Sequence, residues 1–492
     1  MILSGERRPG EIAQIERLHL GRAYVSVLQR FLAGFDSERT EIAIRERAER
    51  SLPDAGNGYW SHTFRIAGRT PACSGMPHWY ANNLTKPEHI PPTEPNLTVD
   101  ELVRRADALR PLLRERQTAC EEAGELSEDT NNRFIAAGFY RILQPRCFGG
   151  YEFALPDFIR VMMAVARGCS ESAWVLALTS GHTVLAAQLS ESAQREVFGA
   201  TGDFRAPGVG MPGGVGVPCD GGLRVKGAWD YASGCDLATH FFGSTIVHDP
   251  ETKASLGNAW ILIDRDQFTI IDNWNVIGMQ GTGSRRVVIE DAFVPADRAL
   301  WFLDGQGRPV RDQPGHALHP NPMYHGWLAP LLISEVAAVS VGAARGALDI
   351  YEDILTNKKT NFQPFHARSR EAEFQQHFGE AQALIDTAEA ALLKLAADYM
   401  DLARRHVETG TPLDEEMERR LILMEQHVIR LAWDAVELMF RTSGTSAAAK
   451  SSPLGRSLRN LAVIRTHVTL QLDHTAGNAG RLHFGLPPLS RF

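Results

Sequence analysis

The sequence predicts a mainly α-helical protein with a small β domain in its middle, and three observations support this order. Residues 97–205, and again residues from about 324 to 480, have the apolar spacing of amphipathic helices. Residues 206–322 differ, because glycine and proline are frequent there and short runs alternate between apolar and polar side chains. Apolar residues make up 44% of the chain and charged residues 22%, which excludes a disordered, collagen-like or coiled-coil protein.

The first 96 residues do not follow the pattern of the rest. Residues 11–50 favour one or two helices, and residues 86–96 contain four prolines, which predicts an extended linker. We assign residues 1–96 to an N-terminal appendage and Pro-rich linker of unknown role. The alternative is a natural start at an internal methionine, with Met76 as the candidate, and the sequence does not decide between the two.

Residues 97–205 are predicted to form an N-terminal helical domain. Thr98 and Glu101 have the spacing of a capping box, so a long amphipathic helix is expected to begin just after Thr98. Further helices are expected at about residues 130–137, 155–167 and 171–189.

The β domain and the C-terminal bundle follow. Residues 206–322 are predicted to form a small β barrel or sandwich, and residues 323–492 a bundle of three or four antiparallel helices. Strands are expected at residues 223–233, 240–249, 258–264, 268–272 and 285–294, and long bundle helices at 332–355 and 380–400.

Charge and cysteine usage exclude several functional classes. The net charge of -8 gives no overall attraction to nucleic acid or to an anionic membrane. No run approaches the ~20 apolar residues that span a bilayer, and charges stand where a signal peptide needs an apolar core. The six cysteines lack zinc-finger spacing. We therefore expect a cytoplasmic protein without a metal site, a nucleic-acid partner or a membrane partner.

Two apparent nucleotide motifs do not hold. Residues 208–213 match G-x-G-x-x-G, but more glycine and proline follow where a helix must hold the pyrophosphate. The segment near residue 444 lacks the second glycine of a phosphate-binding loop. The chain therefore has no recognisable nicotinamide site of its own.

Four segments in order resemble the acyl-CoA dehydrogenase superfamily. They are LQPRCFGGYE at 143–152, the strand pair at 222–246, the strand at 278–300 and the helix at 341–354. The resemblance covers roughly residues 98–485 and implies an N-terminal helical domain, a small β barrel or sandwich, and a C-terminal four-helix bundle. It also implies a flavin bound between the β domain and the bundle.

Within this superfamily, the sequence is more similar to the oxygenase components of two-component flavin monooxygenases. Trp174 and His182, eight residues apart, match their substrate-facing helix, and WDYASG matches their W-x-x-x-S-G. The turn IGMQGTGS and the pair Arg459…His467 also match, although Asn460 stands where those enzymes have aspartate. The tyrosine–glutamate pair that carries the commonest dehydrogenase base is replaced here by His467 and Val468.

The resemblance assigns roles to individual residues. A serine near flavin N5 helps to preserve a C4a-hydroperoxide, and a histidine with an unperturbed pKa of about 6.5 is suited to draw off a phenolic proton. The implied catalytic residues are His467, His182 and Ser233; the implied cofactor-binding residues are Trp229, Ser233, Gly234, Thr282, Ser284 and Arg459; the implied substrate-binding residues are Trp174, His182 and His467.

The expected function is that of an oxygenase component that uses reduced flavin (FMNH₂ or FADH₂) and O₂ to hydroxylate a small phenolic or indolic substrate. A separate NAD(P)H:flavin reductase would supply the flavin, and a homotetramer is expected from the resemblance. FAD-specific members use an arginine and a glutamine of neighbouring subunits, for which Lys358–Lys359 and Gln375–Gln376 are loose counterparts. Two alternatives stay open: an acyl-CoA dehydrogenase with Glu335, Glu352 or Glu380 as its base, and a flavin-free binding protein.

Overall fold

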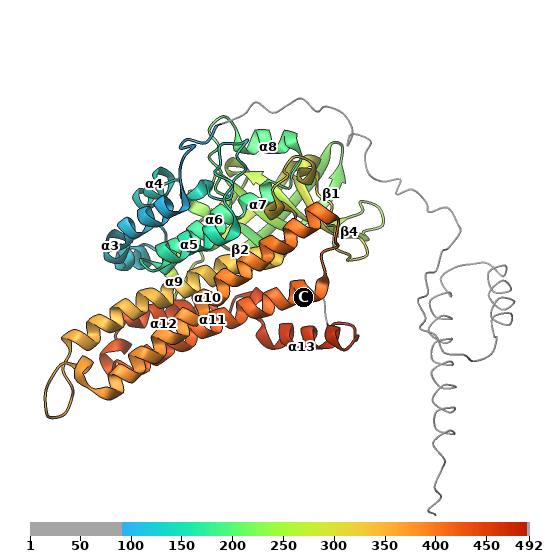
Figure 1. Cartoon of the computed structure of the whole chain (residues 1–492). Helices are drawn as coiled ribbons and strands as arrows, with labels where there is room; N and C mark the ends of the chain where they lie inside the picture. Colours follow the sequence, from blue (N-terminus) through green and yellow to red (C-terminus); the bar gives the residue numbers. More distant parts are fainter. Residues whose placement is uncertain (1–90, 490–492) are drawn as a thin grey trace, which may run out of the picture. The chain divides into compact units, whose positions relative to one another are not determined.

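The computed structural model describes residues 91–489, and Figure 1 shows their arrangement. The predicted appendage and the candidate start at Met76 lie outside these residues, apart from residues 91–96. Helices cover one side of a central sheet, and the long C-terminal helices extend away from it. The predicted order of helices, β domain and helical bundle is confirmed.

The N-terminal region is helical, as predicted. Its helices are α3 Val99–Ala123, α4 Glu128–Ala136, α5 Leu155–Ala166, α6 Ser170–Gly181, α7 Thr183–Ala186 and α8 Glu191–Phe198. Thr98 caps α3, because its Oγ1 accepts a hydrogen bond from the backbone N–H of Glu101 at 3.2 Å. The single helix expected at 171–189 is interrupted at His182, where α6 ends and α7 begins.

The β domain is one mixed sheet of seven strands in the order β5-β6-β2-β1-β3-β4-β7. The strands are β1 Gly208–Cys219, β2 Gly222–Ala232, β3 His240–His248, β4 Ser255–Asp264, β5 Thr269–Ile271, β6 Arg285–Pro295 and β7 Ala299–Asp304. Strands β2 to β6 are the five predicted runs. Strands β1 and β7 were not predicted, and β1 lies at the centre of the sheet, antiparallel to β2 and parallel to β3.

Strand β1 contains the rejected G-x-G-x-x-G segment, and its glycines have a packing role. A Cβ on Gly214 would lie 2.3 Å from Trp229 Cζ2, so only hydrogen fits between the strand and the indole ring. Trp229 fills the inner face of the sheet together with Phe241 and Ile261. Glycine in β1 therefore makes room for a tryptophan, which is why this strand lacks the apolar alternation that marks the others.

The sheet is also covered on its outer face. Phe241 of β3 points into the inner core, and the next residue, Phe242, points the opposite way against Phe204 and Leu262. The outer cluster includes residues of α8, such as Phe198. The outer cluster therefore joins the central strands to the N-terminal helices.

The C-terminal region is a bundle of long helices. They are α9 Leu328–Asn357, α10 Ala372–Thr409, α11 Glu415–Thr442, α12 Pro453–Ile464 and α13 Leu472–His483. Among the described residues, α9 alone is long and apolar enough to cross a membrane, but 89% of its most apolar window is buried inside the protein. Helix α9 is therefore the central core helix, and it packs against α5, α6, α10 and α11. The predicted domain boundaries fall between α8 and β1 and just before α9.

The close approach at Gly214 yields a stability prediction. Gly214→Ala forces a methyl group into the Trp229 ring, and we expect the free energy of unfolding to fall by about 1–3 kcal/mol or more. Gly216→Ala on the same strand is the matched control, because its Cβ would lie 3.3 Å from Thr245 Cγ2 and requires only small adjustments. Urea unfolding of both variants measures the difference, and equal losses would contradict the packing role.

Candidate active site

Three hydroxyl side chains form a continuous hydrogen-bonded row between α6 and the sheet. Trp174 Nε1 of α6 donates to Ser233 Oγ at 2.9 Å. Ser233 Oγ lies 2.7 Å from Ser284 Oγ, which lies 2.7 Å from Thr282 Oγ1. All four side chains are buried. Ser233, Ser284 and Thr282, called the hydroxyl row below, thus bring together predicted site residues from separate parts of the chain.

The two ends of the hydroxyl row fix the direction of its hydrogen bonds. Trp174 Nε1 can only donate, whereas the carbonyl oxygen of Met279, 2.8 Å from Thr282 Oγ1, can only accept. Thr282 therefore donates its proton to Met279, Ser284 donates to Thr282, and Ser233 donates to Ser284. Ser233 keeps one lone pair that no described residue uses, so the row presents an acceptor and no donor.

Backbone contacts hold the 278–284 loop, which carries Thr282 and Ser284, against the end of β2. The N–H of Gly234 donates to the carbonyl oxygen of Thr282 at 2.9 Å. Gly234 has a φ of +75°, and a Cβ there would lie 2.5 Å from Val175 Cγ1 of α6. Gly234 thus acts through its conformation and its N–H, and no larger residue fits without a shift.

Two buried side chains anchor the same loop from the helices. Glu171 of α6 accepts a hydrogen bond from the N–H of Gly281 at 2.9 Å. Asn460 of α12 accepts from the N–H of Met279 at 2.6 Å and donates through Nδ2 to Ser170 Oγ at 3.0 Å. The amide offers an acceptor and a donor at once, which gives Asn460 a clamping role that does not depend on charge.

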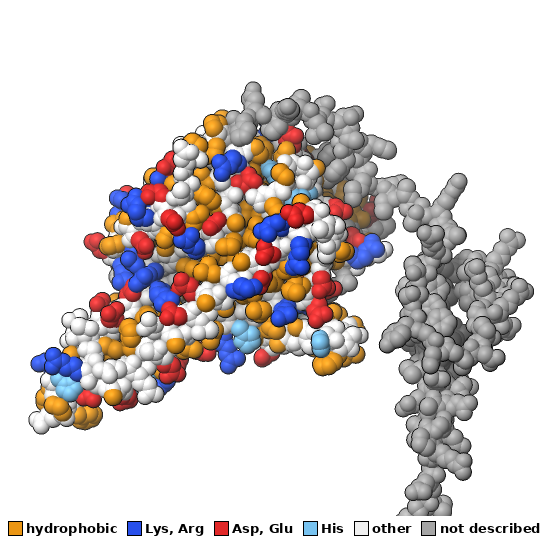
Figure 2. Space-filling model, viewed as in Figure 1, with side chains coloured by type: hydrophobic (Ala, Val, Ile, Leu, Met, Phe, Trp, Pro, Cys, Tyr) orange, Lys and Arg blue, Asp and Glu red, His pale blue; other side chains and the backbone are white. Residues whose placement is uncertain are grey.

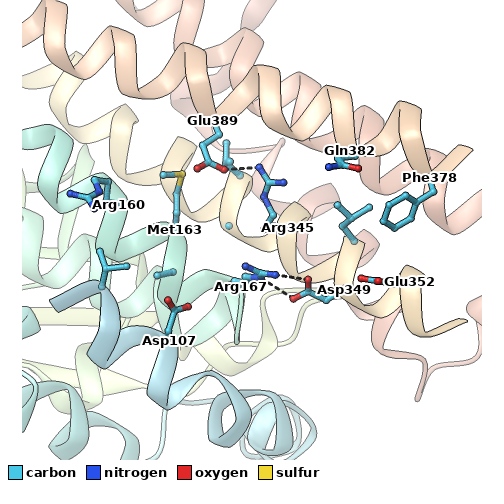
Figure 3. A pocket seen from close by; sticks show the side chains of 15 residues that line it. Asp107, Arg160, Met163, Arg167, Arg345, Asp349, Glu352, Phe378, Gln382 and Glu389 are labelled. Atoms are coloured by element: carbon cyan, nitrogen blue, oxygen red, sulfur yellow. Dashed lines mark hydrogen bonds and ion pairs between the residues drawn. The ribbon is translucent and has the colours of Figure 1, made fainter. Parts of the chain in front are cut away.

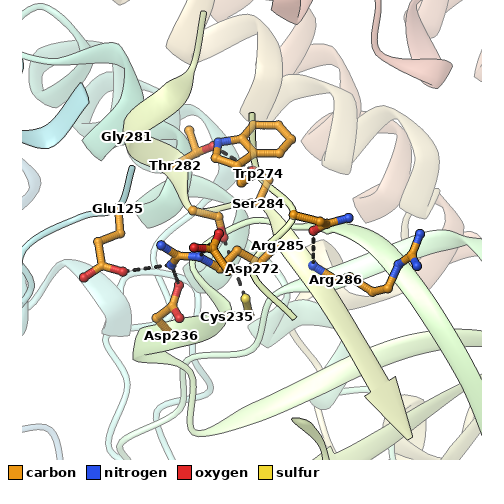
Figure 4. Close-up of polar contacts among 12 residues, drawn as sticks. Glu125, Cys235, Asp236, Asp272, Trp274, Gly281, Thr282, Ser284, Arg285 and Arg286 are labelled. Atoms are coloured by element: carbon orange, nitrogen blue, oxygen red, sulfur yellow. Dashed lines mark hydrogen bonds and ion pairs between the residues drawn. The ribbon is translucent and has the colours of Figure 1, made fainter. Parts of the chain in front are cut away.

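Arg285, directly after the loop, is surrounded by carboxylates (Figure 4). Its Nη1 donates to Glu125 Oε2 at 2.8 Å and also contacts Asp236, and its Nε donates to Asp272 at 3.1 Å. These partners come from the turn after α3, from the segment after β2 and from the end of β5. Arg285 therefore fixes the point where the loop enters β6.

His467 lies beside the hydroxyl row. Its ring meets the Trp174 ring edge to face, with 5.9 Å between the ring centroids. Nδ1 accepts a hydrogen bond from the backbone N–H of Thr469 at 3.4 Å and lies 2.8 Å from Thr469 Oγ1, and Nε2 has no hydrogen-bond partner in the described part of the chain. Burial lowers the pKa of His467 to about 4, so the imidazole is neutral at neutral pH. The ring is only partly shielded from solvent, which fits a side chain that borders an open space.

His182 lies apart from the hydroxyl row, at the junction of α6 and α7. Its Nδ1 donates to the carbonyl oxygen of Ala206 at 2.8 Å, so in the neutral ring Nε2 is an acceptor. Burial lowers the pKa of His182 to about 4. Its ring packs against Trp260, with 6.2 Å between centroids. The predicted substrate contact of His182 therefore depends on Nε2.

Two predicted cofactor-binding residues have other partners. Trp229 is 1% exposed inside the sheet and donates through Nε1 to the carbonyl oxygen of Ser244 at 2.8 Å. Arg459 donates to Glu121 Oε1 at 2.6 Å, and Arg456 donates to the other oxygen of the same carboxylate at 2.8 Å. The structure does not bring either residue into the hydroxyl row, and their contact with a cofactor stays a prediction.

The glutamates considered as dehydrogenase bases are poorly suited to proton removal. Glu352 and Glu380 are exposed on the outside of the bundle. Glu335 is fully buried on α9, and a Cβ on Gly181 would lie 1.9 Å from its Oε1. Neither oxygen of Glu335 has a partner among the described residues, and burial raises its pKa well above the usual value. A carboxyl that stays protonated is not a ready base.

Sequence reasoning missed three functional neighbours: Glu171, Thr469 and Met279. Glu171 follows Ser170 in the matched helix segment, and an acidic residue in a helix's first turn is ordinarily explained by the helix dipole. The carbonyl oxygen of Met279 carries no side-chain signal at all. Thr469 lies two residues after His467, a spacing at which side chains often contact each other. Of the three residues, it was the one that the sequence could have indicated.

A separate hollow of about 560 Å³ lies between α3, α5, α9 and α10 (Figure 3). None of the hydroxyl-row residues lines it. Its arginines already have acidic partners: Arg167 binds Asp349, and Arg345 binds Glu389. Within residues 91–489, no group of three or more His, Cys, Asp or Glu side chains is placed to hold a metal ion.

The residues around the hydroxyl row fit a reduced flavin. Leu178 is partly exposed although the rest of α6 is buried, and His467 is partly accessible, so open space borders this side of α6. The N5 atom of a reduced flavin carries a hydrogen, which matches the unused lone pair of Ser233. Trp174 supplies an aromatic wall beside the hydroxyl row.

Comparisons with known proteins agree with this assignment. A family model for the C-terminal domain of acyl-CoA dehydrogenases matches residues 334–472. The oxygenase subunit HsaA of a flavin-dependent monooxygenase from Rhodococcus jostii is 30% identical over 404 residues, covering 78% of this chain and 98% of the relative. The oxygenase component of the FADH(2)-dependent resorcinol hydroxylase of Rhizobium sp. is 27% identical over 420 residues, covering 84% and 100%.

A solved structure shows the same fold. The crystal structure of 3-HSA hydroxylase from Rhodococcus sp. RHA1 matches with a TM-score of 0.73 at 29% identity, covering 80% of this chain and 99% of that chain.

The buried carboxyl of Glu335 yields a pH prediction. Its raised folded pKa means that the native state keeps a proton that the unfolded state releases above about pH 4.3, so stability falls as pH rises. We expect Glu335→Gln to flatten this slope, which is at most about 1.4 kcal/mol per pH unit for one proton. Urea unfolding between about pH 5 and 8 measures it.

The exposed Glu352 on the same helix provides the control. Glu352→Gln should keep the wild-type slope of unfolding free energy against pH. Parallel curves for wild type and Glu335→Gln would show that Glu335 is ionised in the folded state, which contradicts the assignment.

Proposed function

Because the chain belongs to the family of flavin-dependent monooxygenase oxygenase subunits, we propose that it hydroxylates a small aromatic substrate with reduced flavin and O₂. The single observation that carries the proposal is the hydroxyl row beside the paired rings of Trp174 and His467. Reduced flavin supplies the electrons that activate O₂. The chain's own residues bind the flavin, exclude water and move the substrate proton.

Ser233 is proposed to accept a hydrogen bond from flavin N5–H through its remaining lone pair. Its oxygen is held in place from both sides, by Trp174 at 2.9 Å and Ser284 at 2.7 Å. A fixed acceptor in a site with little water keeps the N5 proton in place and slows loss of the activated oxygen as H₂O₂. Trp174 serves as both donor to Ser233 and wall of the pocket.

His467 is proposed to be the base for the substrate. Nδ1 accepts from the backbone N–H of Thr469 at 3.4 Å, so the base role requires the other tautomer, in which Nδ1–H donates to Thr469 Oγ1 and Nε2 is left as an acceptor for a phenolic O–H. The neutral form needed for this step is favoured, because burial lowers the pKa of His467 to about 4. Drawing the phenolic proton toward Nε2 enriches the aromatic ring in electron density. His182, with Nε2 as an acceptor, is proposed to bind a second polar group of the substrate.

A phenol is the substrate class that these groups favour, with an indole as the second candidate. Both proposed contacts to the substrate are neutral acceptors, which suits hydroxyl or N–H groups better than a carboxylate or phosphate. The resorcinol hydroxylase among the relatives is FADH(2)-dependent by name, which supports FADH₂ as the first flavin to test, with FMNH₂ as the alternative.

A separate NAD(P)H:flavin reductase is proposed as the partner, since the relatives are named as oxygenase subunits or components.

We also propose a homotetramer in the cytoplasm. Apolar side chains at the far end of the α9–α10 hairpin are exposed (Figure 2), including Phe362 at 83% and Phe365 at 59%. Large exposed aromatic side chains of this kind are typical of surfaces that are covered in an assembly.

The function is tested by mixing the protein and chemically reduced FAD, or FMN, with oxygenated buffer and a panel of phenols and indoles. Mass spectrometry should detect a product that has gained one oxygen atom. Oxidation of an acyl-CoA thioester by tightly bound FAD would support the dehydrogenase alternative instead. Failure to bind flavin in any state would support the binding-protein alternative.

Substitution of His467 tests its role as the base. His467→Ala should lower the hydroxylation rate by about 10²–10⁴-fold, the usual contribution of a general base, while flavin binding changes little. Single-turnover product formation and flavin titration measure the two effects. Thr469→Val should give a smaller loss, because it removes only the partner that orients the ring. Loss of folding in His467→Ala, seen by circular dichroism, would indicate a structural residue.

Substitution of Ser233 tests the hydrogen bond to the flavin. Ser233→Ala removes the acceptor and leaves Trp174 Nε1 without its partner, so more of the consumed O₂ should appear as H₂O₂ and less as product. The ratio of H₂O₂ to hydroxylated product measures the effect. An unchanged ratio in a folded variant would remove Ser233 from the mechanism.

A further inference from the structure

The hydrogen bonds of the hydroxyl row all run in one direction, from donor to acceptor. This direction affects which redox state of the flavin the site accepts. Its first donor is Trp174 Nε1 and its last acceptor is the carbonyl oxygen of Met279. Neither group can reverse its role. Reversal of the row would leave two oxygens, Thr282 Oγ1 and the Met279 carbonyl, facing each other at 2.8 Å without a proton between them. The Met279 carbonyl would still accept from the backbone N–H of Thr282 at 3.2 Å and from Trp274 Nε1 at 3.3 Å, so the cost of reversal is the repulsion between two buried oxygens.

Each hydroxyl proton of the row is therefore already used. Ser233 Oγ accepts from Trp174 and donates to Ser284, and one lone pair remains. All three hydroxyl side chains are at most 4% exposed. The row can accept one more hydrogen bond at Ser233, and it has no proton to donate there.

Reduced and oxidised flavin differ at the atom that this lone pair is proposed to meet. In reduced flavin N5 carries a hydrogen and is a donor, whereas in oxidised flavin N5 has only a lone pair and is an acceptor. Two acceptors facing each other in a buried site repel and leave both groups unsatisfied. On this basis, and resting on the proposed function, we infer that the Trp174–Ser233–Ser284–Thr282–Met279 chain selects the redox state of the flavin by admitting a donor at N5 and rejecting an acceptor.

The inference identifies Thr282 as a specificity residue, although it lies two hydroxyl groups away from the flavin. Without the Thr282 hydroxyl, Ser284 can turn its proton toward Ser233 at 2.7 Å, and Ser233 then has a proton to donate. A row reversed in this way can bind oxidised N5. The backbone of the loop keeps its place, since Gly234 still donates to the Thr282 carbonyl oxygen.

The test measures flavin binding and does not require turnover. Dissociation constants of the full-length protein for oxidised FAD and for dithionite-reduced FAD, and likewise for FMN, are determined under anaerobic conditions. Wild type should bind the reduced form more tightly. In Thr282→Val the ratio of the oxidised to the reduced dissociation constant should fall about 5- to 10-fold, as expected for one hydrogen bond. Most of this change should be tighter binding of oxidised flavin.

Two variants serve as controls. Thr282→Ser restores the hydroxyl and should return the wild-type ratio. Ser172→Ala removes another buried hydroxyl of α6, which donates to Cys169 Sγ at 3.2 Å outside the hydroxyl row, and should leave the ratio unchanged. Circular dichroism and thermal unfolding verify that each variant folds.

The outcomes separate this inference from the proposed function. Wild type that binds flavin without preferring the reduced form, or Thr282→Val with an unchanged ratio, overturns redox selection by the row and leaves the oxygenase assignment standing. Loss of affinity for both forms in Thr282→Val, with no recovery of oxidised binding, also overturns it, because Thr282 would then serve only to hold the loop. Absence of binding to either form by wild type overturns the proposed function itself.

Discussion

The architecture of the site depends on one constraint, which is that buried polar groups must find partners. Helix α6 is buried on nearly all sides, yet it carries both Trp174 and Glu171, one turn apart. Trp174 holds one end of the hydroxyl row, and Glu171 holds Gly281, next to the other end, at 2.9 Å. Helix α6 thus positions both ends of the hydroxyl row. Displacement of either end would leave several buried groups unpaired at once.

The same constraint joins the sheet to the bundle. Asn460 connects α12 to the 278–284 loop and to the start of α6, and Glu121 of α3 binds both Arg456 and Arg459 of α12. Glu121 is almost completely buried, and the two guanidinium groups hold its pKa below the usual value. Charges near the site are therefore paired: Glu121 binds Arg456 and Arg459, and Arg285, next to Ser284, binds Glu125, Asp236 and Asp272.

The sequence predicted the fold because helical and strand periods differ strongly between the three regions. It did not predict β1, since the glycines of that strand serve Trp229, and their effect depends on a contact across the sheet. At the site, Ser233, Thr282, Ser284, Trp174 and His467 were predicted through the resemblance, and the structure brings them together. Trp229 Nε1 and the Arg459 guanidinium bind Ser244 and Glu121, and the contact of these two residues with a cofactor stays a prediction. The direction of the hydroxyl row depends on a backbone carbonyl, which no side-chain pattern reveals.

The protonation of buried groups explains why this arrangement favours oxygenation over dehydrogenation. A dehydrogenase base must be an ionised carboxylate, and the fully buried Glu335 has neither a cation nor a donor among the described residues to stabilise that charge. Where a carboxylate would be expected near the ring of Trp174, the chain has His467, which loses its charge by the same desolvation that keeps Glu335 protonated. Burial therefore keeps Glu335 as a neutral acid and His467 as a neutral base. A neutral imidazole can accept a hydrogen bond from a phenolic O–H and draw the proton toward the ring, whereas complete transfer would give an imidazolium and a phenolate.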